Sequence, residues 1–196
     1  MLELYQFELS SYAEKIRLIL DYKGLEYRKI EVTPGIGQLD LYQLSGQRQV
    51  PVLKDKTEVI ADSTAIALYL EKTYPENPII PTDPKQRALC LMMEEWADES
   101  LGIKGRKAML GAFSQSPDFR TAVLPPTTPD FPKNLVGAVP HEAFDLLGMG
   151  VGFGPDEVKA ARKSLEQDLE SLVVLLTDSP YLLGETPTLA DFTVAG

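Results

Sequence analysis

The chain has 196 residues, of which 44% are hydrophobic and 24% charged, a composition that excludes disordered and collagen-like proteins and fits one large domain or two small ones. Its 19 lysines and arginines stand against 29 acidic residues, and a protein with a formal net charge of −10 is a poor partner for nucleic acid. The single cysteine, Cys90, excludes an internal disulfide, and the single histidine, His141, argues against a histidine-rich metal site.

The N-terminus carries neither the basic segment nor the apolar stretch of a secretion signal. No stretch of the sequence reaches the roughly 20 uncharged apolar residues of a membrane helix. We therefore expect a soluble, cytoplasmic protein without a membrane partner.

Strand and helix patterns alternate in the first part of the chain, where period-two alternation indicates strands and apolar residues at helical spacing indicate helices. The predicted strands are residues 2–7, 26–32, 50–53 and 58–61, and the predicted helices begin near Ser11, Gly35 and Asp62. The resulting order, β-α-β-α-β-β-α, predicts an α/β unit with a small mixed sheet.

A proline-rich segment from Tyr74 to Pro84 predicts a boundary between two domains, residues 1–80 and residues 85–196. Beyond this boundary no segment has a clear strand pattern. Residues 112–154 are rich in proline and glycine, which predicts a long irregular connection. Residues 157–177 are predicted to form a strongly amphipathic helix with leucines along one stripe.

The first predicted helix begins at a pair of serines, Ser10 and Ser11, with Glu14 close behind. Ser11 and Glu14 have the spacing of a capping box, in which each side chain bonds a backbone amide of the first turn. This interpretation leaves Ser10 at the positive end of the helix dipole, where its hydroxyl can donate to an anion. Serine before a helix is more often structural, so this motif alone is a weak signal.

Two further segments offer binding groups. Gln49-Val50-Pro51 starts a predicted strand, and a cis Val50–Pro51 bond would turn the Val50 backbone toward solvent, although a simple strand start is the plainer interpretation. Asp62-Ser63 opens a helix, where backbone amides can bind an anion and Asp62 an ammonium group. The alternative there is an ordinary helix cap.

Taken together, the runs Gln49–Leu53 and Asp62–Leu70 resemble the glutathione-binding half of the soluble glutathione S-transferases. Ser10 stands where the serine-type classes of that family (phi, theta and zeta) carry their catalytic serine. Thr188-Leu-Ala-Asp191, a second capping-box pattern, looks like the family's signature in its helical domain. The resemblance implies an α/β thioredoxin-like N-terminal domain and an all-α C-terminal domain. Because family members continue with further helices, it leaves open whether this helical domain is truncated.

The resemblance also implies a set of site residues. Ser10 donates a hydrogen bond to the thiolate of glutathione, and Val50, before a cis proline, pairs its backbone with the cysteinyl part. The γ-glutamyl end is expected to bind Gln49, Asp62 and Ser63. For the glycyl carboxylate the sequence offers only Gln38 and Arg48, a departure from the His/Lys pair of the phi class.

Neighbouring residues bear on two alternatives. Tyr5 lies one residue from Gln6, the position that matches the catalytic tyrosine of the tyrosine-type classes, and should point to the other face of its strand. Tyr5 is therefore the runner-up to Ser10. Ser11 and Tyr12 occupy the region where glutaredoxin-like and omega-class relatives carry a cysteine, which disfavours mixed-disulfide chemistry.

The function expected from the resemblance is conjugation of the glutathione thiolate to small electrophiles, a detoxification reaction of a homodimer. Glutathione is then a co-substrate, and no metal is expected. One alternative is a non-catalytic relative that uses the fold for binding or assembly. The other is a glutathione-dependent isomerase or dehalogenase, which would share the first domain.

The remaining polar residues receive structural roles at this stage. Cys90 is expected to be a buried neutral thiol, Arg17 a half-buried ion-paired residue and His141 a surface residue. Four acidic residues are expected to form a solvated helix face: Glu94, Glu95, Asp98 and Glu99.

Overall fold

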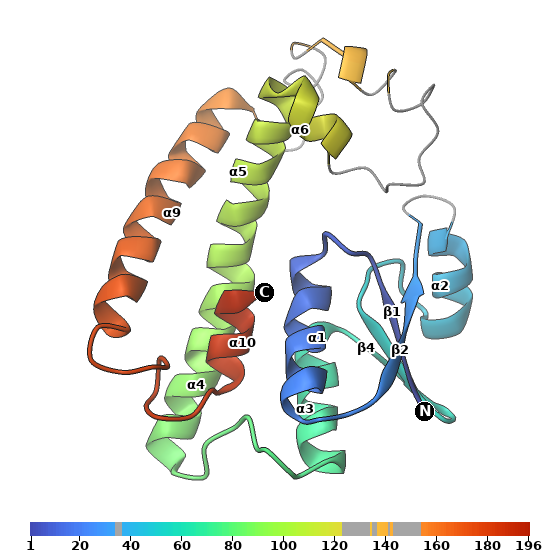
Figure 1. The fold of residues 1–196 in the computed structure, drawn as a ribbon, viewed down its shortest axis with the longest axis vertical. Coiled ribbons are helices and arrows are strands. Elements are labelled where there is room, and N and C mark those ends of the chain that lie inside the picture. Colours follow the sequence, from blue (N-terminus) through green and yellow to red (C-terminus); the bar gives the residue numbers. More distant parts are fainter. Residues whose placement is uncertain (34–36, 123–133, 135–136, 141, 143–153) are drawn as a thin grey trace. The chain divides into compact units, whose positions relative to one another are not determined.

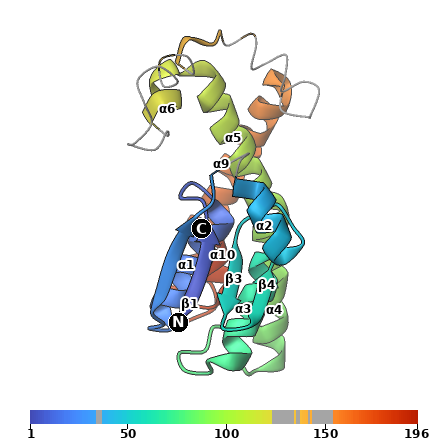
Figure 2. The same ribbon diagram turned by 90° about the vertical axis from the view of Figure 1, so that its right-hand side faces the viewer.

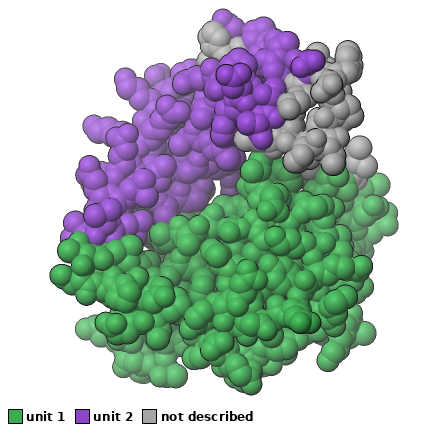
Figure 3. Space-filling model, viewed as in Figure 1, with its two compact units in different colours: residues 1–98, 175–196 green, residues 99–174 purple. Residues whose placement is uncertain are grey.

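The computed structural model describes residues 1–33, 37–122, 134, 137–140, 142 and 154–196. The chain divides into two compact units, one formed by Met1–Asp98 together with Leu175–Gly196 and the other by Glu99–Val174 (Figure 3). The domain boundary expected between residues 80 and 85 stays a prediction. By packing, the helix that follows it and the C-terminal residues belong to the unit that contains the sheet.

Four strands form a mixed sheet in the first unit, in the order β2-β1-β3-β4 (Figure 1). The strands are β1 (Leu2–Gln6), β2 (Tyr27–Glu31), β3 (Val52–Asp55) and β4 (Glu58–Ala61). β1 runs parallel to β2 and antiparallel to β3, and β3 and β4 form the predicted hairpin. The mixed sheet expected from the alternating pattern is confirmed.

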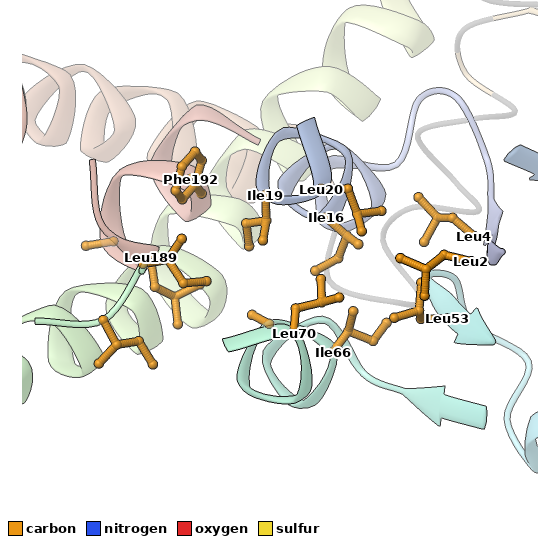
Figure 4. Close-up of a cluster of buried hydrophobic side chains, with 14 of the residues drawn as sticks. Leu2, Leu4, Ile16, Ile19, Leu20, Leu53, Ile66, Leu70, Leu189 and Phe192 are labelled. Atoms are coloured by element: carbon orange, nitrogen blue, oxygen red, sulfur yellow. The ribbon is translucent and has the colours of Figure 1, made fainter. Parts of the chain in front are cut away.

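Helices cover both faces of this sheet (Figure 2). α1 (Ser11–Tyr22) and α3 (Ser63–Thr73) pack on one face, and α2 (Gly37–Ser45) packs on the other. Leu2 and Leu4 of β1 face α1 and α3 within the main core, together with Ile16, Ile19, Leu20, Ile66 and Leu70 (Figure 4). Burial of these apolar side chains is the main driving force that holds the helices on the sheet.

Two further helices complete the first unit, α4 (Pro84–Trp96) and α10 (Leu189–Ala195). α10 packs on α1 and α4 and carries the predicted capping box, in which the Thr188 amide donates to Asp191 Oδ2 at 2.7 Å. The chain approaches α1 closely at Gly196, where an added Cβ would lie 2.7 Å from the backbone nitrogen of Lys15. This close approach requires glycine at position 196.

The second unit contains α5 (Gly102–Gln115), α6 (Pro117–Ala122) and nearly all of α9 (Pro155–Leu175); a π-helical turn, η1 (Ala97–Leu101), precedes α5. α5 and α9 approach each other at Gly111, where an added Cβ would lie 2.3 Å from Val158 Cγ1. An ion pair of 2.6 Å between Lys104 and Asp168 also joins them. None of the helices in the described part of the chain combines the length and apolar character of a membrane span.

The structure of this unit differs from the sequence-based predictions in two places. α5 and α6, separated by the extended residue Ser116, carry helix to residue 122, so the segment expected to be irregular from residue 112 begins as helix. Most of its remainder and His141 lie outside the described residues. The leucine stripe of α9 is also only partly covered: Leu172 is buried, but Leu169 is 50% exposed.

Candidate functional site

The strand register brings three loops to one end of the sheet. Tyr5 pairs with Val52 and Val52 with Ala61, so β1 and β4 end where β3 begins. The loop after β1 leads into α1, the loop after β4 leads into α3, and the Val50–Pro51 bond precedes β3. The site residues proposed in these loops therefore gather at one end, which we refer to as the site end.

Ser10, not Ser11, caps α1. The Ser10 backbone is extended, its carbonyl accepts from the Glu14 amide at 2.9 Å, and its Oγ accepts from the Ala13 amide at 3.2 Å. Ser11 is the exposed first residue of the helix. The capping box predicted for Ser11 and Glu14 is therefore wrong, and Glu14 pairs instead with Arg17, one turn along α1.

A turn before the helix explains this one-residue shift. The Ser10 amide donates to the Phe7 carbonyl at 2.9 Å, so the chain has already turned when it reaches Ser10. The Ser10 hydroxyl accepts the capping bond and keeps its own proton, because a hydroxyl has one donor and two acceptor positions. This proton can be donated to an anion at the positive end of α1.

Asp62 caps α3 from a backbone conformation that few residues adopt. Its φ is 80° and its ψ is 131°, in a region that carries a conformational penalty for residues other than glycine. Asp62 Oδ1 accepts from the Ala65 amide at 2.9 Å, and the residue is exposed. Ser63, the first residue of α3, is buried. A carboxylate therefore faces solvent at the site end.

The Val50–Pro51 peptide bond is cis, as the resemblance implied. Val50 is half-buried and lies two residues before β3, outside the ladder that β3 forms with its neighbours. Gln49 is exposed, and its carbonyl accepts from the side-chain amide of Gln47 at 3.2 Å.

The two residues considered for the glycyl carboxylate lie on and just after α2. Gln38 is half-buried in the first turn of that helix. Arg48 is exposed, and its guanidinium carbon lies 5.6 Å from the centre of the Tyr42 ring, within the range of a cation–π contact. Their assignment to a carboxylate stays a prediction.

A buried polar side chain behind the site end was not singled out in the sequence. Gln6 is fully buried at the end of β1; its Nε2 donates to Glu8 at 2.9 Å and to Glu31, and its Oε1 accepts from Arg17. Arg17 is more buried than expected, at 6% exposed, and also donates to the Glu8 carbonyl at 3.0 Å. A glutamine at an inward-facing position of an alternating strand was the signal in the sequence that could have indicated this buried polar group.

Tyr5 faces the side of the sheet that α2 covers. Its ring packs with Leu41 and Val52, and its hydroxyl donates to Glu3 at 3.4 Å. The prediction that Tyr5 points away from the face of Gln6 is confirmed. Of the two candidates Ser10 and Tyr5, only Ser10 therefore places its hydroxyl at the N-terminus of α1.

Two of the four acidic residues expected on a solvated face are not solvated. Glu94 is 2% exposed and Asp98 is half-buried, and both bind Lys15 of α1, at 2.7 and 2.9 Å. Burial raises the pKa of the Asp98 carboxyl, although the Lys15 ammonium opposes the shift. Two signals in the sequence could have indicated this cluster. The two acidic residues have i, i+4 spacing, and Lys15 stands among the apolar positions of α1.

Cys90 is buried, as expected, and burial raises the pKa of its thiol, which keeps it in the unreactive neutral form. Within the described ranges, no group of histidine, cysteine, aspartate and glutamate side chains is arranged to hold a metal ion.

Comparison with protein families matches two parts of the chain. The model described as "Glutathione S-transferase, N-terminal domain" matches residues 4–78, and "Glutathione S-transferase, C-terminal domain" matches residues 155–196. Together the two ranges cover more than half of the chain.

Curated relatives agree with these matches. The chain is 43% identical over 91 residues to glutathione S-transferase 1 of Dianthus caryophyllus, and 37% identical over 91 residues to a zeta-class glutathione S-transferase of Euphorbia esula. Each alignment spans 45% of this chain and 41% or 40% of the relative, less than half its length. Maleylacetoacetate isomerase of Dictyostelium discoideum is 32% identical over 117 residues, 57% of this chain and 53% of that protein.

Two solved structures share the fold. A glutathione S-transferase from Rhodospirillum rubrum F11 has a TM-score of 0.70 at 23% identity, covering all of this chain and 75% of its own. The beta-etherase LigF from Sphingobium sp. strain SYK-6 has a TM-score of 0.72 at 23% identity, covering 98% and 80%.

Proposed function

The chain belongs to the glutathione S-transferase family, and we propose that it is a serine-type member that activates glutathione with Ser10. The observation that carries this proposal is the geometry of the Ser10 hydroxyl, which caps α1 as an acceptor and retains its proton for a second partner. The hydroxyl stands at the site end, where the loops that carry Val50 and Asp62 also emerge.

Glutathione binding follows from the same arrangement. The Asp62 carboxylate binds the α-ammonium of the γ-glutamyl end, with Gln49 and the start of α3 at Ser63 beside it. The Val50 backbone pairs with the cysteinyl part, because its amide and carbonyl are not used by the sheet ladder. For the glycyl carboxylate, Gln38 and Arg48 are the candidates near α2.

Activation of the thiol is a matter of anion stabilisation. A free thiol has a pKa of about 8.5, so only a few per cent is thiolate at neutral pH. A donated hydrogen bond and the N-terminus of α1 both favour the anion, and each unit by which the thiol pKa falls is worth about 1.4 kcal/mol. The thiol proton goes to solvent. The thiolate then forms a carbon–sulfur bond with an electrophilic carbon, and the leaving group departs with the bonding electron pair.

The wider proposal is that of a cytoplasmic homodimer that detoxifies small electrophiles, with glutathione as co-substrate and without a metal. A second candidate is glutathione-dependent isomerisation, favoured by the 117-residue match to maleylacetoacetate isomerase. An isomerase uses the same thiolate but returns glutathione unchanged. Recovery of free glutathione after turnover therefore separates the two reactions.

The direct test is an ultraviolet titration of the bound glutathione thiol in two neighbouring variants. Ser10→Ala should raise the thiol pKa and reduce conjugation at neutral pH by about tenfold or more, because one anion donor is lost. Ser11→Ala is the matched control: its side chain is exposed and does not cap the helix. If only Ser11→Ala shifts the thiol pKa, the two serines are assigned the wrong way round.

Glutathione binding is tested at Asp62, the residue that caps α3. Asp62→Asn keeps a side-chain oxygen for the Ala65 amide and removes the charge, so calorimetry should show glutathione affinity about tenfold weaker or more. Asp83→Asn makes the same change at the cap of α4, where Asp83 accepts from the Gln86 amide at 2.9 Å, and should leave affinity unchanged. Equal affinity in both variants would contradict the role of Asp62.

A further inference from the structure

A buried ion cluster joins three helices within the first unit. Lys15 of α1 is 1% exposed at its side chain, and its Nζ lies 2.7 Å from Glu94 Oε1 and 2.9 Å from Asp98 Oδ2. Glu94 belongs to α4 and Asp98 to the η1 turn that follows it. The Glu94 side chain is 3% exposed and that of Asp98 is 14% exposed, so the cluster is largely removed from water.

Thr64 brings α3 into this cluster. Its hydroxyl donates to Glu94 and accepts from Lys15 Nζ at 3.4 Å, so it bridges the cation and one of the anions. Asp98 Oδ2 lies 3.3 Å from the same hydroxyl oxygen. A second link comes from α1, where the Tyr12 hydroxyl donates to the Asp98 carbonyl at 3.2 Å.

The members of the cluster stand directly behind the site end. Thr64 is the second residue of α3 and follows Asp62 by two positions. Tyr12 lies in the first turn of α1, two residues after Ser10, and Lys15 lies in the second turn. The end of α4 is therefore connected to the N-terminal turns of both helices that begin at the site end.

The charges do not balance, which argues against a purely stabilising role. One ammonium faces two carboxylates, and burial raises the pKa of Asp98 even with Lys15 alongside. Buried ion clusters are often no more stabilising than apolar side chains of similar volume, and in some proteins their role is to fix one arrangement. Here the arrangement that is fixed is that of α1 relative to α3.

We propose that Lys15, through Glu94 and Thr64, is a positioning residue that sets the N-terminal turns of α1 and α3 so that both helix starts address one glutathione molecule. This inference rests on the proposed function. Small displacements of groups that bind a reacting molecule reduce rates strongly, which makes the spacing between Ser10 and Asp62 the quantity that the cluster controls.

The test compares two buried lysines of the same helix. Lys23, at the other end of α1, is 0% exposed at its side chain and pairs with Glu71 at 2.9 Å. Lys15→Met leaves two carboxylates without their cation and Lys23→Met leaves one, so both should lower stability. At a temperature where both are folded, Lys15→Met should weaken glutathione binding about tenfold and raise the pKa of the bound thiol. Lys23→Met should change neither.

Further variants keep the result interpretable. Lys15→Arg keeps the positive charge between the two carboxylates and should therefore retain more of the binding and of the thiol pKa than Lys15→Met. If Lys15→Met does not fold, Lys15→Met combined with Glu94→Gln and Asp98→Asn removes both unpaired charges. Thr64→Val and Thr64→Ser test the bridge, because the first removes the hydroxyl and the second keeps it. Thr64→Val should weaken glutathione binding, and Thr64→Ser should not.

Each outcome decides the matter. If the unmodified protein binds glutathione but Lys15→Met leaves binding and the thiol pKa unchanged, as Lys23→Met should, or if Thr64→Val binds normally, the positioning role is overturned and the proposed function stands. If the unmodified protein does not bind glutathione, the proposed function fails and this inference fails with it.

Discussion

The two ends of the sheet use the same kinds of side chain in opposite ways. At the site end, Ser10 and Asp62 each satisfy one backbone amide and remain partly or fully exposed. At the far end, where α1 and α3 finish, Asp55 is buried and accepts from the hydroxyls of Tyr69 at 3.0 Å and Tyr74 at 2.6 Å.

The far end also contains a buried lysine whose ammonium group has several hydrogen-bond acceptors around it. Lys23 Nζ donates to Glu71 at 2.9 Å and faces the backbone carbonyls of Tyr74, Glu76 and Asn77 at 2.9–3.2 Å. Lys23 and Asp55 are thus bound within the fold, whereas Ser10 and Asp62 are the residues proposed to bind glutathione. Substitutions at the two ends should therefore separate stability from binding.

The largest effect on stability should come from Glu71→Ala at the far end. The change leaves the fully buried Lys23 ammonium without its counter-charge and frees the amides of Ile79 and Ile80, which donate to Glu71 at 3.1 and 3.2 Å. Breaking a buried ion pair lowers the free energy of unfolding by about 3–5 kcal/mol, measured by chemical denaturation.

Glu76→Ala is the control for that experiment, because Glu76 is exposed and offers Lys23 only its backbone carbonyl. It should change the free energy of unfolding by no more than about 0.5 kcal/mol. Glutathione affinity of the folded fraction should be unchanged in both variants. A loss of affinity in Glu71→Ala would show that the two ends are coupled.

A smaller loss is expected for Tyr74→Phe, which removes one of the two hydrogen bonds to the buried Asp55 carboxylate. A hydrogen bond to a charged group contributes about 1.5–3 kcal/mol, so the free energy of unfolding at neutral pH should fall by that order. Tyr69→Phe removes the longer bond and should cost less. Equal losses would contradict the ranking by distance.

The same pair predicts how stability depends on pH. Hydrogen bonds from Tyr74 and Tyr69 lower the pKa of Asp55, so its contribution is present above the ordinary aspartate pKa and is lost as pH falls through the lower folded value. The Asp55 bond and burial raise the pKa of Tyr74 to about 12 from 10.0, so that contribution is present below 10.0 and is lost as pH rises toward 12. Tyr74→Phe should flatten the alkaline part of a stability–pH curve.

The smallest effects belong to the site end. Ser10→Ala removes the cap of α1 and should lower the free energy of unfolding by about 0.5–2 kcal/mol. Ser11→Ala should stay within about 0.5 kcal/mol, because its side chain is exposed in the first turn. Thermal or chemical denaturation of both variants measures these losses. A larger loss in Ser11→Ala than in Ser10→Ala would indicate that Ser11, not Ser10, caps α1.

Local patterns predicted the elements well because they depend on neighbouring residues. Alternation along β1, the hairpin of β3 and β4, and the capping box of Thr188 and Asp191 were all visible in short stretches. The cap of α1 was misplaced by one residue, because the choice between Ser10 and Ser11 depends on the turn that begins at Phe7. A helix start is set by backbone geometry, which a serine pair does not specify.

Sequence patterns predicted the mixed sheet, the order of its strands along the chain and the loops that carry Ser10, Val50 and Asp62. It also indicated the family, through side-chain types at short spacings. Which charges are buried depends instead on how the helices pack. Lys15 meets Glu94 and Asp98 across about 80 residues of sequence, since a cation and anions so far apart in the chain become neighbours only when α1 and α4 pack together.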